Sequence, residues 1–285
     1  MRAAWAEPRS LVLAEEELAL PGWPAALDGL RVALVSDVHA GAGHMTPPRL
    51  AGIVDHVLGA EADVHLLLGD YLDSTGLGDG RARALQVAEE LARLPGAVAV
   101  LGNHDEAVVQ GSRPTMTADA RQVVEWTRSQ LAPDQIDFLR ARPLTAVDWD
   151  ILYVHANARA PAGWAYIEGR SEAVRSLQAS DRRYTFCGHV HDQALYHLSS
   201  AGKAGDFAPT PGMPIPLSSH RRWLAIPGSA GQPRDGNPAA CYAIFEPDVA
   251  TLTFHRVAYD HDTAAAKVRA AGLPEALAQR LIHAG

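Results

Sequence analysis

The segment Leu34-Val35-Ser36-Asp37-Val38-His39 joins a short apolar run to an aspartate and a histidine two positions apart. The run from residue 31 to residue 36 is rich in β-branched residues, which predicts a buried strand. Asp37 and His39 therefore stand at the carboxyl end of that strand. The same arrangement recurs four times along the chain, and this recurrence decides the fold and the kind of site that we expect.

Four further apolar runs each end directly before a polar group. The groups are Asp70 after Leu66–Leu68, Asn103 with His104 after Val98–Leu101, His155 after Leu152–Val154, and His189 with His191 after Phe186 and Cys187. Glycines precede Asp70, Asn103 and His189, and a glycine permits a tight turn where a strand ends. Each polar group is thus predicted to follow a strand without an intervening loop.

Helical patterns alternate with the first three strands. Residues 50–58 and 85–94 carry apolar side chains at helical spacing, and they separate strands predicted over 31–36, 64–68 and 97–101. This alternation predicts right-handed βαβ units and a parallel sheet. Because the carboxyl ends of parallel strands open on one side, we expect the five polar groups to meet in one crevice.

The rest of the chain changes from alternating helices and strands to strands alone. Two helices are predicted at Ala118–Leu131 and Pro133–Arg140, and the further predicted strands are Ile151–Val154, Tyr184–Cys187, Leu195–Leu198, Trp223–Ile226, Tyr242–Glu246 and Thr251–Val257. The stretch Gly202–Ser219, rich in Gly, Pro and Ser, is predicted to be a surface loop and a candidate rim of a substrate pocket.

Three parts of the chain are expected. Residues 1–30 form an N-terminal strand and linker, residues 31–260 form the catalytic domain, and residues 261–285 form a helical tail. At 285 residues with 47% hydrophobic composition, the chain can bury a full core.

Composition excludes some classes of partner. The net charge of −8 argues against binding long nucleic acid, although Arg221, Arg222 and Arg234, close in sequence, leave room for a local basic pocket. No stretch approaches the roughly 20 apolar residues of a membrane span. Only two cysteines occur, Cys187 and Cys241, and both lie in apolar runs. Two buried thiols without a signal peptide predict a cytoplasmic protein.

The side chains at the strand ends are carboxylates, one amide and histidines, with no thiolate among them. Mixed nitrogen and oxygen ligands suit Mn²⁺, Fe or Zn²⁺, and Mn²⁺ is our first choice. These ligands are too many for one tetrahedral ion, and Asp70 stands where it could bridge two. Two divalent ions about 3.5–4 Å apart clamp the attacking and leaving oxygens of a displacement at phosphorus. Any one motif alone would be an ordinary strand end or turn, so the prediction depends on all five together.

The five motifs resemble the pattern of the calcineurin-like metallophosphoesterase superfamily: Asp-x-His, Gly-Asp, Gly-Asn-His-Asp, His and Gly-His-x-His, here spread from residue 37 to residue 191. The resemblance implies a β-sandwich flanked by helices in αββα layers, with the active site at the carboxyl ends of the strands. It also implies the ligands of two metal ions. The first ion takes Asp37, His39, Asp70 and His191, and the second takes Asp70, Asn103, His155 and His189.

A finer resemblance concerns the substrate. The segment Gly228-Ser229-Ala230-Gly231-Gln232-Pro233-Arg234-Asp235 is similar to one in bacterial diadenosine tetraphosphatase-like phosphoesterases. In contrast, residues 28–41 resemble phosphodiesterases that act on lipid-linked substrates. We therefore expect a small phosphate monoester or diester, either nucleotidic or lipid-derived.

The predicted mechanism has a hydroxide, held between the two metals, that attacks phosphorus. His104 is the candidate general acid for the leaving oxygen. A carboxylate should orient it, and both Asp73 and Asp105 are candidates. Arg234 and His44 are candidate substrate contacts.

Two rival functions stay open. In phosphoprotein phosphatases an Arg-Gly pair continues the second motif and grips phosphate, whereas Ser74 and Thr75 follow Asp73 here. A catalytically inactive scaffold of the same fold should lose the general acid or a metal ligand, and this sequence keeps both. The acidic net charge disfavours a nuclease of the superfamily.

Overall fold

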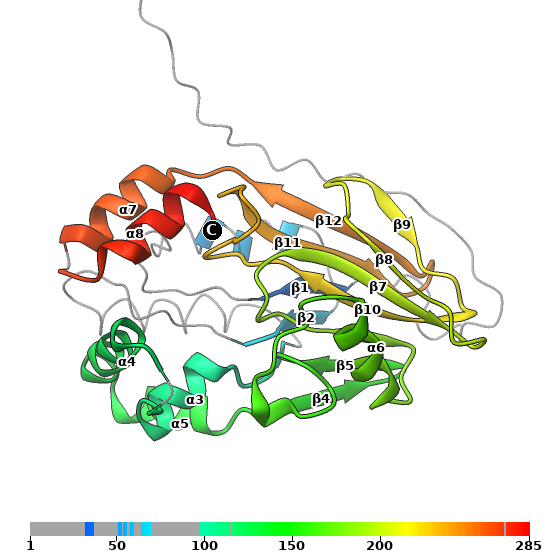
Figure 1. Cartoon of the computed structure of the whole chain (residues 1–285), viewed down its shortest axis with the longest axis horizontal. Coiled ribbons are helices and arrows are strands. Elements are labelled where there is room, and N and C mark those ends of the chain that lie inside the picture. The colour runs from blue at the N-terminus through cyan, green and yellow to red at the C-terminus, as the bar shows by residue number, and fades with distance from the viewer. Residues whose placement is uncertain are drawn as a thin grey trace, which may run out of the picture.

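Two β-sheets, packed face to face, make the body of the protein. In this computed structural model, the described residues are 32–36, 51–52, 54–55, 58–59, 64–69, 97–114, 116–270 and 272–285. Each sheet has six strands, in the orders β3-β2-β1-β11-β12-β9 and β4-β5-β6-β10-β7-β8 (Figure 1).

The first sheet contains the parallel strands that the sequence predicts. Its strands are β1 (Val32–Val35), β2 (Val64–Leu67), β3 (Val98–Ala99), β9 (Pro214–Pro216), β11 (Ala240–Glu246) and β12 (Thr251–Val257). β1 pairs in parallel with β2, and β2 in parallel with β3. β11 is antiparallel to β1, with Leu34 opposite Ala243. The three parallel strands therefore end at the same edge, as expected.

The second sheet carries the histidine motifs. Its strands are β4 (Thr145–Asp148), β5 (Ile151–Val154), β6 (Tyr184–Phe186), β7 (Gln193–Ser199), β8 (Ala204–Phe207) and β10 (Arg221–Pro227). β6 pairs in parallel with both β5 and β10. All four residues of β5 are buried because both of its faces are covered. Tyr153 joins the core between the sheets, whereas Val154 packs in a second cluster with residues of α6 (Arg170–Gln178).

The helices gather mainly at one end of the sandwich. They are α3 (Asn103–Gln110), α4 (Ala118–Gln130), α5 (Pro133–Arg140), α7 (His261–Ala270) and α8 (Glu275–His283), with a short 3-10 turn, η2, at Pro161–Gly163. Val123 of α4 belongs to the same apolar cluster as Val268 and Leu281, so the C-terminal helix pair contacts α4, at the same end of the molecule (Figure 1). No helix in the described ranges is long and apolar enough to cross a membrane.

Most predicted elements are confirmed, including the sandwich flanked by helices and the helices at 118–130 and 133–140. Residues 51–52, 54–55 and 58–59 are helical, as predicted for 50–58. The helix predicted at 85–94 and the N-terminal strand within residues 1–30 lie outside the described residues. Both cysteines are free and buried, as expected.

One prediction was wrong. Gly202–Ser219 is not a continuous surface loop, because it contains β8 and β9. Both strands lie at sheet edges, where backbone pairing with a single neighbour suffices to order a polar or proline-containing segment.

Candidate active site

The carboxyl ends of strands from both sheets meet at the helix-rich end of the sandwich. Asn103 is the first residue of α3, the helix that follows β3, and His155 directly follows β5. Nδ1 of His155 lies 2.9 Å from the carbonyl oxygen of Leu68, the residue after β2. The backbone N–H of Gly188 donates to the carbonyl of His155 at 2.8 Å. These contacts bring the second, third, fourth and fifth motifs together.

Three side-chain atoms converge at this point. Nε2 of His155 lies 3.0 Å from Oδ1 of Asn103 and 3.2 Å from Nδ1 of His189. The opposite ring nitrogens of both histidines face carbonyl oxygens, which can only accept: Leu68 for His155, and Trp164, 3.0 Å from Nε2 of His189. In a neutral imidazole the nitrogen that faces a carbonyl must carry the proton, and the other nitrogen has a lone pair.

The consequence is an electrostatic one. With both rings neutral, two imidazole lone pairs and an amide oxygen face one another across about 3 Å, an arrangement that a cation between them would stabilise. Histidine nitrogens and amide oxygens are ligands for divalent transition metals, and a carbonyl on the outer nitrogen is the usual device that orients a ligating histidine. The donor set therefore fits a metal ion.

His191 is held in the same manner. Its Nδ1 lies 2.6 Å from the carbonyl oxygen of Gln232, which leaves Nε2 with the lone pair. His155, His189 and His191 are 0%, 4% and 2% exposed, so all three rings lie inside the protein. Within the described ranges, no group of three His, Cys, Asp or Glu side chains could hold a metal ion.

Backbone strain marks the Gly188-His189-Val190-His191 turn. His189 and His191 have φ values of 70° and 72°, in the left-handed region that side chains other than glycine seldom adopt. Strain of this kind costs about 1–3 kcal/mol per residue and is typical of functional sites. The turn aims both imidazoles at the strand ends.

Comparison with known proteins identifies the family. Residues 30–249 match the model of the calcineurin-like phosphoesterase superfamily domain. The chain belongs to the calcineurin-like phosphoesterase superfamily. It is therefore a phosphoester hydrolase of the metal-dependent kind, and the family generally uses a centre of two divalent metal ions.

Relatives of this phosphoesterase span nearly the whole chain. A metallophosphoesterase from Sphaerobacter thermophilus is 33% identical and superposes with a TM-score of 0.73, over 90% of this chain and 100% of that one. A hypothetical protein from Pyrococcus horikoshii shares the fold, with a TM-score of 0.66 at 16% identity over 90% and 99% of the two chains. An uncharacterized protein of Methanocaldococcus jannaschii is 26% identical over 255 residues, which are 88% of this chain and 96% of that relative.

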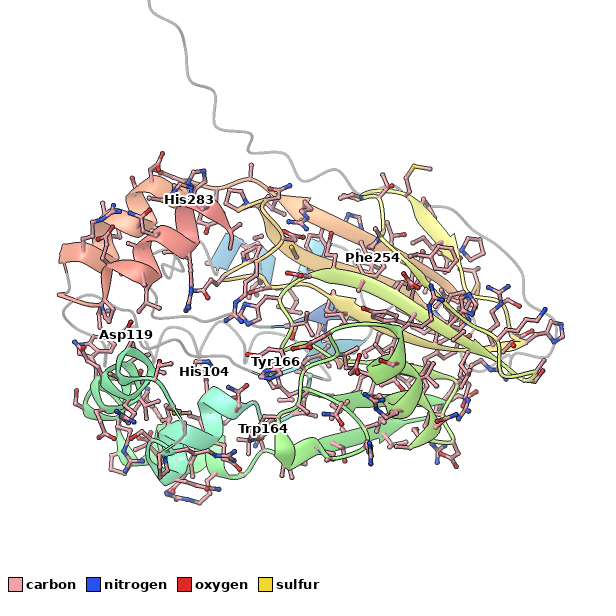
Figure 2. All side chains as sticks on the ribbon, in the orientation of Figure 1. His104, Asp119, Trp164, Tyr166, Phe254 and His283 are labelled. Carbon is pink, nitrogen blue, oxygen red and sulfur yellow. The ribbon has the colours of Figure 1, made fainter. Side chains whose placement is uncertain are left out.

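The candidate general acid stands beside the converging ligands. His104 is partly exposed on the first turn of α3, next to Asn103 (Figure 2). Oδ2 of Asp105 accepts a hydrogen bond of 2.8 Å from the backbone N–H of Gly102 and so caps α3. This bond gives Asp105 a structural role besides the orienting role considered from the sequence.

Arg234 lies on the segment after β10 that reaches the site. The backbone N–H of Ala230 on this segment donates to the carbonyl of Ser36, the residue after β1, at 3.1 Å. Arg234 is partly exposed, and its Nη2 lies 3.4 Å from Oε1 of Gln232. Arg234 is therefore in the neighbourhood of the strand ends and of Gln232, whose carbonyl holds His191.

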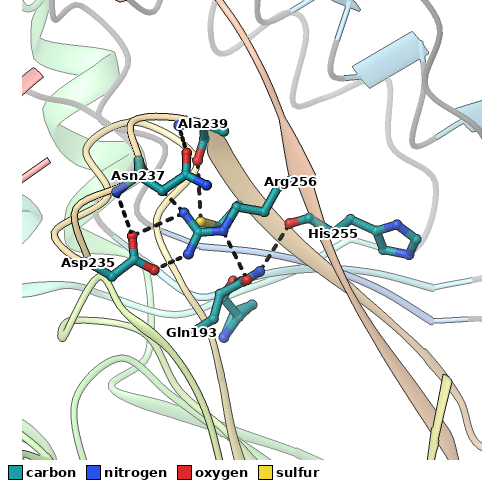
Figure 3. A network of polar contacts seen from close by, with 8 residues as sticks. Gln193, Asp235, Asn237, Ala239, His255 and Arg256 are labelled. Atoms are coloured by element: carbon teal, nitrogen blue, oxygen red, sulfur yellow. Dashed lines mark hydrogen bonds and ion pairs between the residues drawn. The ribbon is translucent and has the colours of Figure 1, made fainter. Parts of the chain in front are cut away.

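A polar network fixes the same segment to both sheets (Figure 3). Arg256 of β12 forms an ion pair with Asp235, and its Nε donates to Oε1 of Gln193 on β7 at 3.1 Å. Its Nη1 also donates to the carbonyl of Asn237 at 3.1 Å. The Arg256 side chain is 13% exposed, so these bonds are partly shielded from water. Burial, and then the carboxylate of Asp235, raises the pKa of Asp192 nearby.

The three arginines considered together from the sequence do not form one pocket. Arg221 and Arg222 begin β10, whereas Arg234 follows its end. The first two, with Arg183, line an open depression of about 610 Å³ at the amino ends of β5, β6 and β10, opposite the site. Gly202 and Ser219 line the same depression, so this predicted rim lies away from the histidines.

Five of the predicted site residues lie outside the described residues: Asp37, His39, His44, Asp70 and Asp73. Asn103, His155, His189 and His191 are brought to the strand ends as expected. The carbonyls of Leu68, Trp164 and Gln232 were not predicted, because a backbone carbonyl has no signature in a sequence. The aromatic ring of Tyr166, stacked on His189, was also missed.

Proposed function

We propose that this phosphoesterase hydrolyses a small phosphate monoester or diester at two divalent metal ions, with Mn²⁺ the first choice and Fe or Zn²⁺ the alternatives. The observation that carries the proposal is the approach of Oδ1 of Asn103 and Nδ1 of His189 to within 3.0 and 3.2 Å of Nε2 of His155, while backbone carbonyls orient both imidazoles from the other side. Membership of the family supports the same chemistry.

The proposed ligands follow the family pattern. Asp70, Asn103, His155 and His189 would hold one ion, and Asp37, His39, His191 and the same Asp70 would hold the other. When bound, such ions supply a nucleophile at neutral pH and neutralise charge on the phosphoryl oxygens.

His104 is the proposed general acid. It directly follows the proposed ligand Asn103 in the chain and is partly exposed, which supports a role in contact with the substrate. It donates a proton to the leaving oxygen, a role suited to imidazole near neutral pH. Asp73 or Asp105 orients the ring, and Arg234 and His44 contact the phosphate.

The test of the proposal is metal analysis of the purified full chain, combined with hydrolysis of bis-p-nitrophenyl phosphate and p-nitrophenyl phosphate with added Mn²⁺. We expect two metal ions per chain and turnover of at least one ester. Fewer than two ions together with no turnover of either ester would refute the proposal.

The role of His104 has its own measurement. His104→Ala should lower kcat by about 10²–10⁴-fold, the usual contribution of a general acid, while metal content stays at two. Loss of metal in this variant would identify His104 as a ligand instead. The variants Asp73→Asn and Asp105→Asn separate the two candidates for orienting His104, since the orienting residue should shift the alkaline limb of the pH–rate profile.

A further inference from the structure

An exposed aromatic ring stands directly beside the proposed metal centre. The ring of Tyr166 stacks on the imidazole of His189, with centroids 4.0 Å apart and an angle of 14° between the planes. Tyr166 is nevertheless 43% exposed, on the segment that follows β5 (Figure 2). One face of the ring thus covers a proposed ligand, and much of the remaining surface meets solvent.

The backbone around Tyr166 is held rigidly. Asn157 donates from Nδ2 to the carbonyl of Ala165 at 2.9 Å and accepts from the backbone N–H of Ala160 at 3.0 Å. Trp164 is buried, and its Nε1 donates to Oε2 of Glu106 at 3.0 Å. Ile167, on the other side, is 1% exposed. Neighbours anchored in the core hold Tyr166 at the surface, so its exposure is built into the fold.

Packing against His189 does not by itself account for this residue. A side chain that only supports the imidazole would be expected to be buried, as Trp164 is. The described residues also provide no hydrogen-bond partner for the phenol hydroxyl. A solvated aromatic face beside a reaction centre is well suited to stack on a flat ring of the substrate. Stacking contributes binding energy and requires no particular pattern of hydrogen bonds.

The alternative ligand, an aliphatic lipid chain, fits the surroundings less well. A chain of that kind needs a continuous apolar surface. Among the described residues, Trp149 lies in the β4–β5 turn and Val147 lies near it on β4, at the opposite end of β5 from His155. Phe207 of β8 packs against His197 and Trp223, and Met213 precedes the edge strand β9. Phe138 lies on α5, beneath the guanidinium of Arg142. None of these described side chains lies on the segment that carries Tyr166.

We propose that Tyr166 is a specificity-determining residue, and that it stacks on a flat heteroaromatic group, such as a nucleobase, of the phosphoester. The inference rests on the proposed function, and it favours a nucleotidic substrate over a lipid-derived one. Tyr166 acts on binding of the group attached to phosphorus and takes no part in the chemical step.

The test compares two phosphate monoesters of the same charge, adenosine 5′-monophosphate and glycerol 3-phosphate. Their dissociation constants are measured by calorimetry on the Mn²⁺-loaded full chain. The wild type should bind the adenine ligand more tightly. Tyr166→Leu, which keeps an apolar contact with His189 but lacks a flat ring, should weaken that ligand roughly 5- to 100-fold. Glycerol phosphate should bind about as it does to the wild type, and Tyr166→Phe should retain the preference for adenine.

A matched control is Phe138→Leu, which removes a ring that is 46% exposed and lies on α5. It should leave the binding of both ligands unchanged. Equal weakening of both ligands by Tyr166→Leu would overturn the proposal and assign Tyr166 to support of His189 alone. A wild type that binds the two ligands equally would overturn it as well.

Failure of this inference is distinct from failure of the proposed function. A wild type that holds two metal ions and hydrolyses bis-p-nitrophenyl phosphate, but shows no preference for adenine, refutes only the role of Tyr166. A wild type without metal and without turnover refutes both.

Discussion

The two ends of the second sheet both carry polar side chains, but these side chains are buried at one end and exposed to solvent at the other. At the carboxyl ends of β5 and β6, His155 and His189 are buried, and each uses its outer nitrogen on a backbone carbonyl. At the amino ends, Arg183 pairs with Asp150 on a depression open to solvent, with both side chains more than 40% exposed.

The difference shows which polar clusters deserve a functional interpretation. Arg222 at the open end donates to the carbonyls of Leu177 and Ser180, both at 2.8 Å, and so caps the end of α6. Its bonds explain its presence in structural terms. The bonds of the buried histidines instead aim Nε2 of His155 and Nδ1 of His189 at each other and at Oδ1 of Asn103, a donor set that suits a metal ion.

The largest expected effect comes from deleting one residue at each end. His155→Ala should reduce hydrolysis by more than the about 10- to 100-fold that loss of an outer-shell partner costs, and should release metal. Arg183→Ala should stay within about twofold of the wild type, because an exposed ion pair contributes little. Equal effects on kcat in the two variants would remove the distinction between the ends.

Glycines at the two ends give a second comparison. Gly69 has φ 97°, and an added Cβ would lie 2.8 Å from Nδ1 of His155. Gly202 has φ 77°, with nothing within 4 Å of the added atom. Gly202→Ala should cost about 1–2 kcal/mol of stability from the left-handed backbone. Gly69→Ala should cost that amount plus about 1–3 kcal/mol from overpacking.

Urea denaturation of the metal-free protein measures both free energies of unfolding, and metal titration measures the consequence for the site. Only Gly69→Ala should weaken metal binding, since it displaces His155. Equal losses of stability in the two variants would show that the contact between residue 69 and His155 is loose.

The Arg256 network allows a third test. Arg256→Gln leaves the partly buried Asp235 without its cation, and we expect a loss of about 2–3 kcal/mol in the free energy of unfolding. Metal binding should weaken about 10-fold, because the segment carrying Gln232 orients His191. Arg269→Gln, which breaks a solvent-exposed pair with Glu275, is the control and should change neither quantity measurably. Unaltered metal affinity in Arg256→Gln would show that the Arg256 network does not help to orient His191.

The smallest effect is a pH dependence at the open end. Burial, followed by the charges of Arg221 and Arg170, lowers the pKa of His197 below 6.5. The unfolded chain then binds more protons than the folded chain just below pH 6.5, so this residue removes stability as the pH falls through that range. Chemical denaturation at pH 7 and pH 5.5 should show a smaller decrease for His197→Gln than for the wild type. An identical decrease in the free energy of unfolding for both proteins would contradict a lowered pKa of His197 in the folded state.

Much of the site could be predicted because its ligands follow strands that the sequence marks clearly. An apolar run followed by Gly and then Asn, Asp or His is a local pattern, and a parallel sheet places such ends together. The carbonyls of Leu68, Trp164 and Gln232 depend on tertiary contacts between distant segments. No pattern of side chains in the sequence predicts these carbonyl contacts.

The missed strands share one cause. β4, β8 and β9 are all edge strands with partly exposed residues, so their sequences lack the apolar alternation of a half-buried strand. β9 begins and ends with proline, which is typical of loops but is tolerated at a sheet edge. The short helices α3 and α6 depend on tertiary packing, because α3 packs against α4 and α5, and α6 packs against β7, β8 and β10.

The most direct measurement is an anomalous difference map from crystals of the full chain grown with Mn²⁺. We predict a peak in contact with Oδ1 of Asn103, Nε2 of His155 and Nδ1 of His189, and a second peak in contact with Nε2 of His191. A map in which ordered manganese is absent from these atoms, in crystals of protein that hydrolyses phosphate esters, would contradict the account.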